Sequence, residues 1–444
     1  MRLTLLRVLL VGVATAALAA QDRPNFVVIL SDDQSWVGSS VRMVPDDAGS
    51  KSDYFLTPEL ERLARSGMTF SAGYAPAPFC CPTRRSLQVG QTPARHLYQR
   101  DRKAWPDRYR RQLNIPKVLK QADSRYTTAH FGKWDHRFDR PTPEEMGYDA
   151  SDGDTGNGTG GAKGTGGPAA AADPKLIDHL TRRACDFLAD QARSGNPFYL
   201  QISHYAVHLD IYYRQATLDL VRAWPAGRKH YMPEFAAMTA DMDASIEVVL
   251  DRIGTLGLSD NTYVIFLSDN GGRATIPGAG KPPMPRNSPL RGAKGSMYEG
   301  GIRVPFFAAG PGIEPGSVSQ TPVTGLDILP TVADLAGYRS DLPAEVDGGS
   351  LRSVFAGGDA VKRDREFLIF HQAVARKAQT AVRLGNWKLV KTWANDLIEL
   401  FNLQDDVGES VNLATRLPMR ADQLHRMMVD FLAEVGAETR KTEE

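Results

Sequence analysis

Cysteine is scarce in this sequence: only Cys80, Cys81 and Cys185 occur among its 444 residues. So small a number excludes a fold that depends on a framework of disulfide bonds. Two states remain open for Cys81 and Cys185, a single disulfide or separate buried thiols, and the low count favours the thiols. The fold must therefore rest on a hydrophobic core, for which a hydrophobic content of 42% is sufficient.

An excess of charge of either sign is also missing. The chain has 53 Lys and Arg against 52 Asp and Glu, which gives a formal net charge of +1. This balance offers no electrostatic basis for binding nucleic acid or an anionic membrane surface, and we expect neither as a partner. The length suggests two domains rather than one.

Long apolar runs are absent after the N-terminus, so no later segment is expected to span a membrane. The N-terminus itself has Arg2 and Arg7, an apolar core between them and beyond, and small residues at 17–20. This pattern predicts a signal peptide over residues 1–20, with a membrane anchor as the alternative. We therefore expect export, to the periplasm or outside the cell.

Two short apolar runs predict strands that are buried on both faces, as in a parallel sheet. Residues 25–30 lead into Asp32 and Asp33, and residues 263–267 lead into Asp269 and Asn270. Ligands bind at the carboxyl ends of strands in open α/β sheets, so these four side chains are expected to form the walls of one site. Four oxygen donors suit a hard cation such as Ca²⁺ and offer zinc neither imidazole nor thiolate. Solvated turn carboxylates are the alternative.

Helical patterns alternate with these strands. One begins at Thr57-Pro58 and ends at Gly67, one begins at Asp173-Pro174, and one follows the apolar spacing from Phe235 to Ile253. The alternation predicts an α/β fold over residues 21–355, with a doubly wound, mostly parallel sheet flanked by helices. The glycine-rich stretch 153–167 is expected to be a flexible loop or one rim of a substrate cleft.

The character of the sequence changes after Phe355. Four short strand-like runs at 367–370, 381–384, 387–390 and 397–400 precede a helical segment from about 419 to 435. This order predicts a smaller C-terminal α+β subdomain, residues 356–444, with an antiparallel sheet.

The most informative motif begins at Cys80, in the order Cys80-Cys81-Pro82-Thr83-Arg84, with Gly90 six residues after Arg84. Pro82 suits the first position of a helix, which would place Cys80 just before a helix N-terminus, where an anion is favoured. Two structural cysteines are the alternative.

This motif resembles the signature of the formylglycine-dependent type I sulfatases, members of the alkaline phosphatase-like superfamily. Residues 290–305 resemble the second signature of that family, which surrounds Lys294 and ends in Glu-Gly-Gly-x-Arg-x-Pro. Lys133, in Gly-Lys-Trp, and His208 stand at further positions of the family pattern. The resemblance extends from Asn25 to Leu413.

The resemblance implies a chemistry. A formylglycine-generating enzyme would oxidise Cys80, and its hydrated aldehyde would attack the sulfur of a sulfate ester, with Asp269 as base. One Ca²⁺ would be bound by Asp32, Asp33, Asp269 and Asn270 and would contact the modified Cys80. Arg84, Lys133 and Lys294 would hold the sulfate oxygens, and His208 or Lys294 would protonate the leaving alcohol. The implied substrate is a sulfated carbohydrate rather than a small aryl or steroid sulfate.

The sequence departs from the family pattern at two places. Asp135 stands where the family usually has a His that contacts the formylglycine hydroxyl, so either Asp135 or the next residue, His136, is expected to take that role. His208 is followed by Leu209-Asp210 where the family commonly has x-Pro, so substrate contacts there are expected to differ. His371 is expected to reach the substrate cleft from the C-terminal subdomain, a packed or exposed His being the alternative.

Three other functions compete with a sulfatase. A phosphomonoester or phosphonate hydrolase of the same fold could use the same nucleophile. A two-zinc phosphatase is disfavoured because Asn270 stands where a His ligand would help to bind zinc. An inactive, secreted glycan-binding homologue would result if Cys80 stayed unmodified.

Overall fold

The computed structural model describes residues 23–96, 109–136, 141–161, 172–277, 284–373 and 378–439. The predicted signal peptide at 1–20 lies outside this range. Within the described residues, no helix combines the length and the apolar character that crossing a bilayer requires. All three cysteines are free, so the expectation of separate thiols is confirmed.

A mixed sheet of eight strands forms the centre of the molecule, in the order β5-β4-β6-β1-β7-β8-β2-β9. Strand β1 lies parallel to both of its neighbours, β6 and β7, and β4 continues the parallel part, whereas β8 runs antiparallel to β7 and to β2. The strands are β1 (Asn25–Ser31), β2 (Met68–Phe70), β4 (Thr127–Gly132), β5 (Ala150–Ser151), β6 (Phe198–Ser203), β7 (Thr262–Ser268), β8 (Phe306–Ala309) and β9 (Ser317–Ser319). The mostly parallel sheet predicted from the apolar runs is confirmed.

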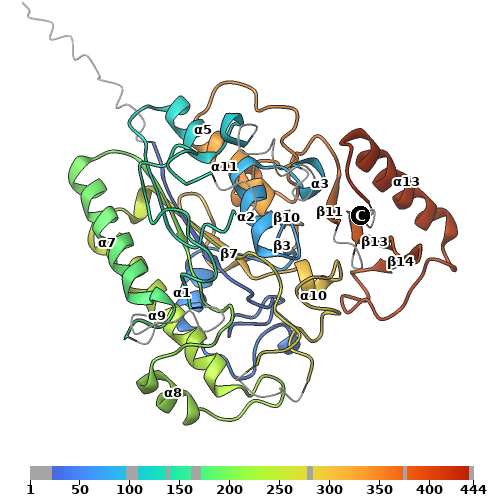
Figure 1. Ribbon diagram of the computed structural model, residues 1–444, viewed down its shortest axis with the longest axis horizontal. Helices are drawn as coiled ribbons and strands as arrows, with labels where there is room; N and C mark the ends of the chain where they lie inside the picture. The colour runs from blue at the N-terminus through green and yellow to red at the C-terminus, as the bar shows by residue number, and fades with distance from the viewer. Residues whose placement is uncertain are drawn as a thin grey trace, which may run out of the picture.

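Helices cover both faces of this sheet (Figure 1). Successive side chains of a strand point to opposite faces, so Val27 and Ile29 of β1 join the core beneath one helical layer and Phe26, Val28 and Leu30 join the other. The first layer contains α1 (Pro58–Ser66), α7 (Ile177–Ser194), α8 (Gln215–Arg222) and α9 (Pro233–Thr255). The second contains α2 (Cys80–Val89), α5 (Ile115–Ala122), α11 (Ile328–Leu335) and α12 (Arg352–Phe355). This arrangement is the predicted doubly wound fold.

Helix α2 begins two residues earlier than its proline suggested. Cys80 is the first helical residue and Phe79 is the N-cap, so Pro82 occupies the third position rather than the first. Any position of the first turn tolerates proline, because the first amides of a helix have no partner within the helix. Cys80 and Cys81 therefore both lie in the first turn, and every residue of α2 is buried.

The C-terminal part forms a second sheet, as predicted. Its four antiparallel strands lie in chain order, β11-β12-β13-β14. Helix α13 packs on one face, and Tyr74, Met297 and Ile302 of the larger part pack on the other. The elements are β11 (Phe367–Gln372), β12 (Gln379–Leu384), β13 (Trp387–Thr392), β14 (Leu397–Asn402) and α13 (Pro418–Glu434).

A buried group of charged and polar side chains connects this second sheet to the larger part of the molecule. Glu299, at the start of α10 (Glu299–Ile302), accepts from Lys388 Nζ at 2.7 Å, Tyr74 Oη at 2.7 Å and Arg303 Nη1 at 3.1 Å. Glu409 lies 2.8 Å from Lys388 Nζ and accepts from the backbone N–H of Glu299 at 2.7 Å. We call Glu299, Lys388, Glu409, Arg303 and Tyr74 the interface cluster.

Candidate functional site

The polar residues at the ends of β1 and β7 meet, as the sequence predicted. The two strands are in register up to Ser31 and Ser268, so the residues that follow them leave the sheet side by side. The backbone N–H of Asp33 donates to Asp269 Oδ1 at 3.1 Å, and Asn270 Nδ2 donates to Asp33 Oδ1 at 2.8 Å. Asp33 has φ 62°, a left-handed conformation that turns the chain sharply at this point.

Three cations converge on these carboxylates. Arg84, from α2, donates through Nε and Nη2 to Asp269 Oδ2 at 2.9 and 2.8 Å. Lys133, just after β4, donates to Asp32 Oδ2 at 2.5 Å, and Lys294 donates to Asp33 Oδ1. We call Asp32, Asp33, Asp269, Asn270, Arg84, Lys133 and Lys294 the strand-end cluster.

The charges of this cluster set one another's protonation. Burial by itself would raise the pKa of Asp32, but Lys133, His208 and Arg84 hold it well below its usual range. Burial, together with the charge of Asp32, raises the pKa of Asp269 to about 6. Burial opposes the charge of Lys294, yet Asp33 and Cys80 raise its pKa above the usual value. Lys294 therefore stays charged at neutral pH and can bind an anion.

The donors of the cluster fit a hard cation. Among the described residues, Asp32 Oδ1, Asp33 Oδ2 and Asn270 Oδ1 are buried and accept no hydrogen bond. Buried oxygens without a donor cost folding free energy, which a bound cation would recover. The charge balance agrees, because four carboxylates, the fourth being Asp135, face three cations. Oxygen ligands of this kind suit Ca²⁺.

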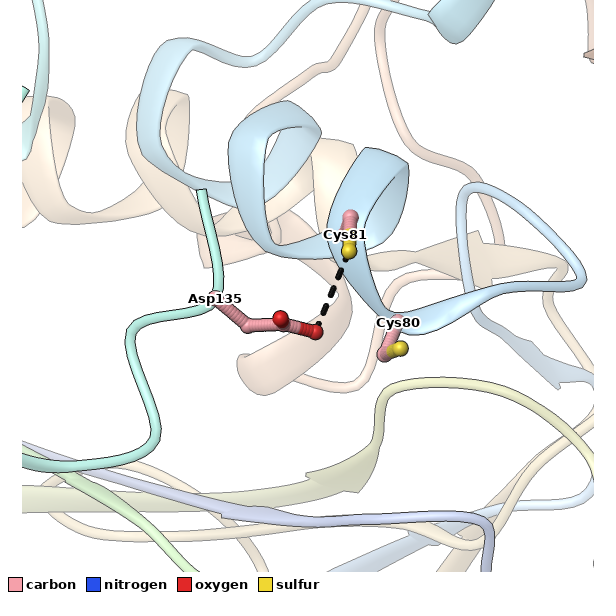
Figure 2. Close-up of side chains that lie close together, drawn as sticks. All are labelled: Cys80, Cys81 and Asp135. Atoms are coloured by element: carbon pink, nitrogen blue, oxygen red, sulfur yellow. Dashed lines mark hydrogen bonds between the residues drawn. The ribbon is translucent and has the colours of Figure 1, made fainter. Parts of the chain in front are cut away.

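Cys80 and Cys81 lie next to this cluster, and Asp135 faces them (Figure 2). Cys81 Sγ donates to Asp135 Oδ2 at 3.1 Å, and the same oxygen lies 3.4 Å from Lys133 Nζ. Hydrogen bonding with Cys81 and the charges of Lys133 and Lys294 lower the pKa of the Cys80 thiol from its usual value. The first turn of α2 therefore presents, beside the three cations, a thiol whose ionised form these surroundings favour.

Comparison with known proteins identifies the family. A family model described as Sulfatase matches residues 24–338, and one described as N-sulphoglucosamine sulphohydrolase, C-terminal, matches residues 293–436. The chain belongs to the sulfatase family. It is a sulfuric ester hydrolase, and its relatives include carbohydrate sulfatases.

Individual relatives are similar over most of their length. A sulfatase of Formosa agariphila is 29% identical over 90% of this chain and 86% of its own. The N-acetylgalactosamine-6-sulfatase of Mus musculus is 27% identical over 85% and 74%. Among solved structures, Ps i-CgsB in complex with k-i-k-neocarrahexaose superposes with a TM-score of 0.76 at 23% identity, covering 92% of this chain and 93% of that one.

The structure separates the two residues that could replace the family's missing His in this sulfatase. Asp135 meets Cys81, as described above. The His136 ring instead stacks on Trp134, with centroids 4.1 Å apart, and on Tyr109 at 5.3 Å. Burial lowers the pKa of His136 well below its usual value, which keeps the ring neutral. His136 is therefore held in an aromatic stack, and Asp135 is the residue that the fold brings to the cysteine pair.

His208 lies at the edge of the strand-end cluster, as its position in the family pattern predicts. Its Nε2 is 3.7 Å from Asp33 Oδ2, and its Nδ1 donates to the carbonyl of Leu209 at 2.7 Å. A carbonyl only accepts, so Nδ1 carries a proton and Nε2 is the free acceptor of the neutral ring. Burial lowers the pKa of His208, although Asp32 and Asp33 oppose this.

The expected role of His371 in the cleft requires correction. Its Nε2 donates to the carbonyl of Glu438 and its Nδ1 accepts from Thr380 Oγ1, each at 2.8 Å. Side chains alternate along β11, and the next residue, Gln372, is the one that donates to the carbonyl of Gly295 beside Lys294. His371 thus lies on the face of β11 that packs toward the C-terminus.

The sequence did not single out Lys175, which the structure places near the site. Its ammonium is buried, donates to the carbonyl of Gly160 at 3.3 Å and lies 5.3 Å from the centre of the Tyr212 ring. Burial lowers the pKa of Lys175 to about 8, against the attraction of Asp32, Asp210 and Asp33. A lysine next to a helix start carries no sequence signal for such a position.

The glycine-rich stretch is described as far as residue 161, and this part packs near Lys175. An added Cβ at Gly160 would come within 2.4 Å of the Tyr205 ring, and one at Gly161 within 2.8 Å of Tyr212. The stretch also holds Asp135, whose backbone N–H donates to the carbonyl of Thr155 at 2.8 Å. These contacts place the described part of the stretch beside Asp135, Tyr205 and Tyr212, and its role as a flexible loop or as one rim of a substrate cleft stays a prediction.

Proposed function

We propose that this sulfatase removes sulfate from a sulfated carbohydrate at the strand-end cluster, with Cys80 converted to formylglycine and one Ca²⁺ as cofactor. The observation that carries the proposal is the set of three buried oxygens without donors, which lies among three cations and beside Cys80. Support for a carbohydrate comes from the relatives, since one is named an N-acetylgalactosamine-6-sulfatase and one structural neighbour holds a neocarrahexaose.

The chain offers ligands for both absent groups. Asp32, Asp33, Asp269, Asn270 and the side chain at position 80 would hold Ca²⁺, which would offset the charge of the sulfate and polarise one of its S–O bonds. Formylglycine, when hydrated, supplies one hydroxyl as nucleophile and a second one that allows the sulfate to be released.

The residues of the chain itself bind and orient the sulfate. Arg84, Lys133 and Lys294 surround the site and present buried donors that stay charged. Donors fixed in a buried site stabilise developing negative charge more strongly than water does, because they need no reorganisation. Lys133 lies between Asp32 and Asp135, so it also screens the anionic substrate from two carboxylates.

Proton transfer to the leaving alcohol falls to His208 or Lys294. His208 carries a proton on Nδ1 toward Leu209, so it must gain a second proton at Nε2 before it can donate one to substrate. Asp33, 3.7 Å away, favours that imidazolium. Asp269, whose pKa is about 6, is mostly ionised at neutral pH and is the candidate base for the nucleophile.

Export and maturation belong to the same proposal. We propose that residues 1–20 direct the chain to the periplasm or the medium, and that a formylglycine-generating enzyme converts Cys80. We further propose that residues 356–444 form a subdomain. It contains the second sheet, and the interface cluster connects it to the rest of the molecule.

One competing activity has a specific observation in its favour. The phosphonate monoester hydrolase of Agrobacterium radiobacter superposes on the chain with a TM-score of 0.65, at 17% identity, so the fold also accommodates phosphorus substrates. An inactive glycan-binding role would follow if Cys80 stayed a thiol.

Two measurements test the proposal together. Mass spectrometry of the peptide that contains Cys80, from protein made in its natural host, should show the loss of sulfur that accompanies formylglycine. The same preparation should release sulfate from a panel of sulfated saccharides faster than phosphate from matched phosphate or phosphonate esters. An intact thiol would favour the binding protein, and a preference for phosphorus esters would favour the hydrolase.

A further inference from the structure

The first turn of α2 and the loop after β4 bring two sulfur atoms and a carboxylate together. Cys80, Cys81 and Asp135 each present one ligand atom, and these atoms all lie within 4.8 Å of one another. All three side chains are buried, and Figure 2 shows both cysteines and the carboxylate at the N-terminus of α2. Two thiols and a carboxylate are a different donor set from the oxygens at the strand ends.

We propose that Cys80, Cys81 and Asp135 bind one thiophilic divalent cation, such as Zn²⁺ or Cd²⁺, in the chain whose Cys80 has not been converted. Zinc lies about 2.3 Å from thiolate sulfur and about 2.0–2.2 Å from carboxylate oxygen, so two of its ligands are roughly 3–4 Å apart. Cys81 Sγ and Asp135 Oδ2, at 3.1 Å, are already within that range. Rotation of the Cys80 side chain would close the rest of the gap.

Binding leaves the net charge of these surroundings unchanged, because one divalent cation replaces two thiol protons. Lys133, which lies 2.5 Å from Asp32 Oδ2 and 3.4 Å from Asp135 Oδ2, continues to face both carboxylates. A buried group of ions is stable only when its charges are compensated. Binding would replace two thiol protons, so it would release protons and strengthen as the pH rises.

This site and the Ca²⁺ site exclude each other through position 80. Soft sulfur ligands select Zn²⁺ or Cd²⁺, whereas the oxygens of Asp32, Asp33 and Asn270 select Ca²⁺. Conversion of Cys80 removes one of the two sulfurs and leaves Cys81 and Asp135 too few to hold the ion. The cation would therefore mark unconverted molecules, and the inference concerns a form of the chain other than the one that carries the proposed activity.

The test uses the full chain made in cells without a converting enzyme, with the thiol of Cys80 verified by mass. Titration with Cd²⁺ in excess Ca²⁺ should give an ultraviolet thiolate-to-cadmium absorption that saturates at one equivalent. Cys81→Ala and Cys81→Ser should each abolish it, and Asp135→Asn should weaken binding about tenfold or more. Cys185→Ala, which removes the third thiol, should leave it unchanged.

Three results would overturn the inference: no absorption at one equivalent, saturation unchanged in both Cys81 variants, or equally tight binding by converted protein. Each variant is first shown to melt like the parent chain without added metal, and the Ala and Ser replacements at position 81 guard against failure of either one to fold. Sulfate release plays no part in the readout, so a failure here is distinguishable from a failure of the proposed activity.

Discussion

Two buried groups of charges in this molecule resemble each other in composition. They differ in how many of their buried acceptor oxygens lack a hydrogen-bond donor. In the interface cluster, all four carboxylate oxygens of Glu299 and Glu409 lie within 3.1 Å of a donor or a cation. In the strand-end cluster, Asp32, Asp33 and Asn270 each keep one buried oxygen without a donor. Glu409 Oε1 also has no hydrogen-bond donor, but Lys388 Nζ lies 2.8 Å from it, whereas the strand-end cluster keeps three buried oxygens without a donor. This difference supports a structural role for the first group and the proposed ligand-binding role for the second.

The variant Cys80→Ala should show the largest effect and tests the difference between the two clusters most directly. This change removes the proposed nucleophile beside the strand-end cluster, so turnover should fall on the order of 10³-fold or more. Arg84, Lys133 and Lys294 keep their carboxylate partners in this variant, so the melting temperature should change little. Sulfate release and calorimetry on the same preparation check both statements. Normal turnover in this variant would contradict the proposed chemistry.

Lys388→Met should have the opposite effect: it should lower stability and leave turnover largely unchanged. It removes a buried cation that Glu299 and Glu409 share, and breaking a buried ion pair from one side costs about 3–5 kcal/mol of unfolding free energy. The variant should unfold at a lower urea concentration, while kcat of the folded fraction should persist, because Lys388 contacts no residue of the strand-end cluster among its bonded partners. The change Lys51→Met, at a partly exposed lysine outside both clusters, serves as control. Unchanged stability would mean that the interface cluster does not fasten the second sheet.

Chelation should affect the strand-end cluster alone. A ligand at about 100 times its dissociation constant stabilises the folded state by about 2.7 kcal/mol, and a chelator should remove that contribution together with most of the activity. Ca²⁺ should restore both. The measurement is a thermal melt with and without chelator, for the parent chain and for Lys388→Met. A melting temperature that is indifferent to chelator would count against the metal site.

Acid should destabilise the C-terminal sheet through His371. Burial lowers the pKa of His371 to about 4, below the usual 6.5, so the folded state prefers the neutral ring. The stability contributed by the neutral ring is present above pH 6.5 and is lost as pH falls toward 4, at up to about 1.4 kcal/mol per pH unit. Urea unfolding between pH 7 and 5 should show a smaller slope for His371→Gln. An identical slope would show that other groups control the acid response.

The smallest expected effect concerns substrate selection. Lys175→Met removes a buried cation near Gly160 and Tyr212, which we expect to contact a second anionic group of a glycan. KM for a glycan with two anionic groups should rise about tenfold, the equivalent of about 1.4 kcal/mol, with little change for a small aryl sulfate. Equal changes in both would place Lys175 in a structural role.

The local sequence pattern predicted those features that depend on residues adjacent in the chain, such as the strands and the residues that follow them. The apolar runs before Asp32 and Asp269 specified strands, and the rule that parallel strands end at one edge brought the four donors together. The contact of Asp135 with Cys81 and the position of Lys175 depend on how loops cross the sheet, for which the sequence has no periodic signal. His371 was placed wrongly because alternation along a strand gives two faces and does not say which one meets the larger part.

The complete burial of α2 has a consequence for timing. Cys80 is only 6% exposed, and all ten residues of its helix are buried, so another enzyme could reach this thiol in the folded chain only by unfolding the centre of the molecule. The proposed conversion of Cys80 would therefore have to compete with folding while the chain is still extended. Each newly made molecule would meet this competition once, and a chain that folds first would keep its thiol. The yield of converted enzyme would then depend on the ratio of two rates, and slowing the packing of α2 onto the sheet should raise it.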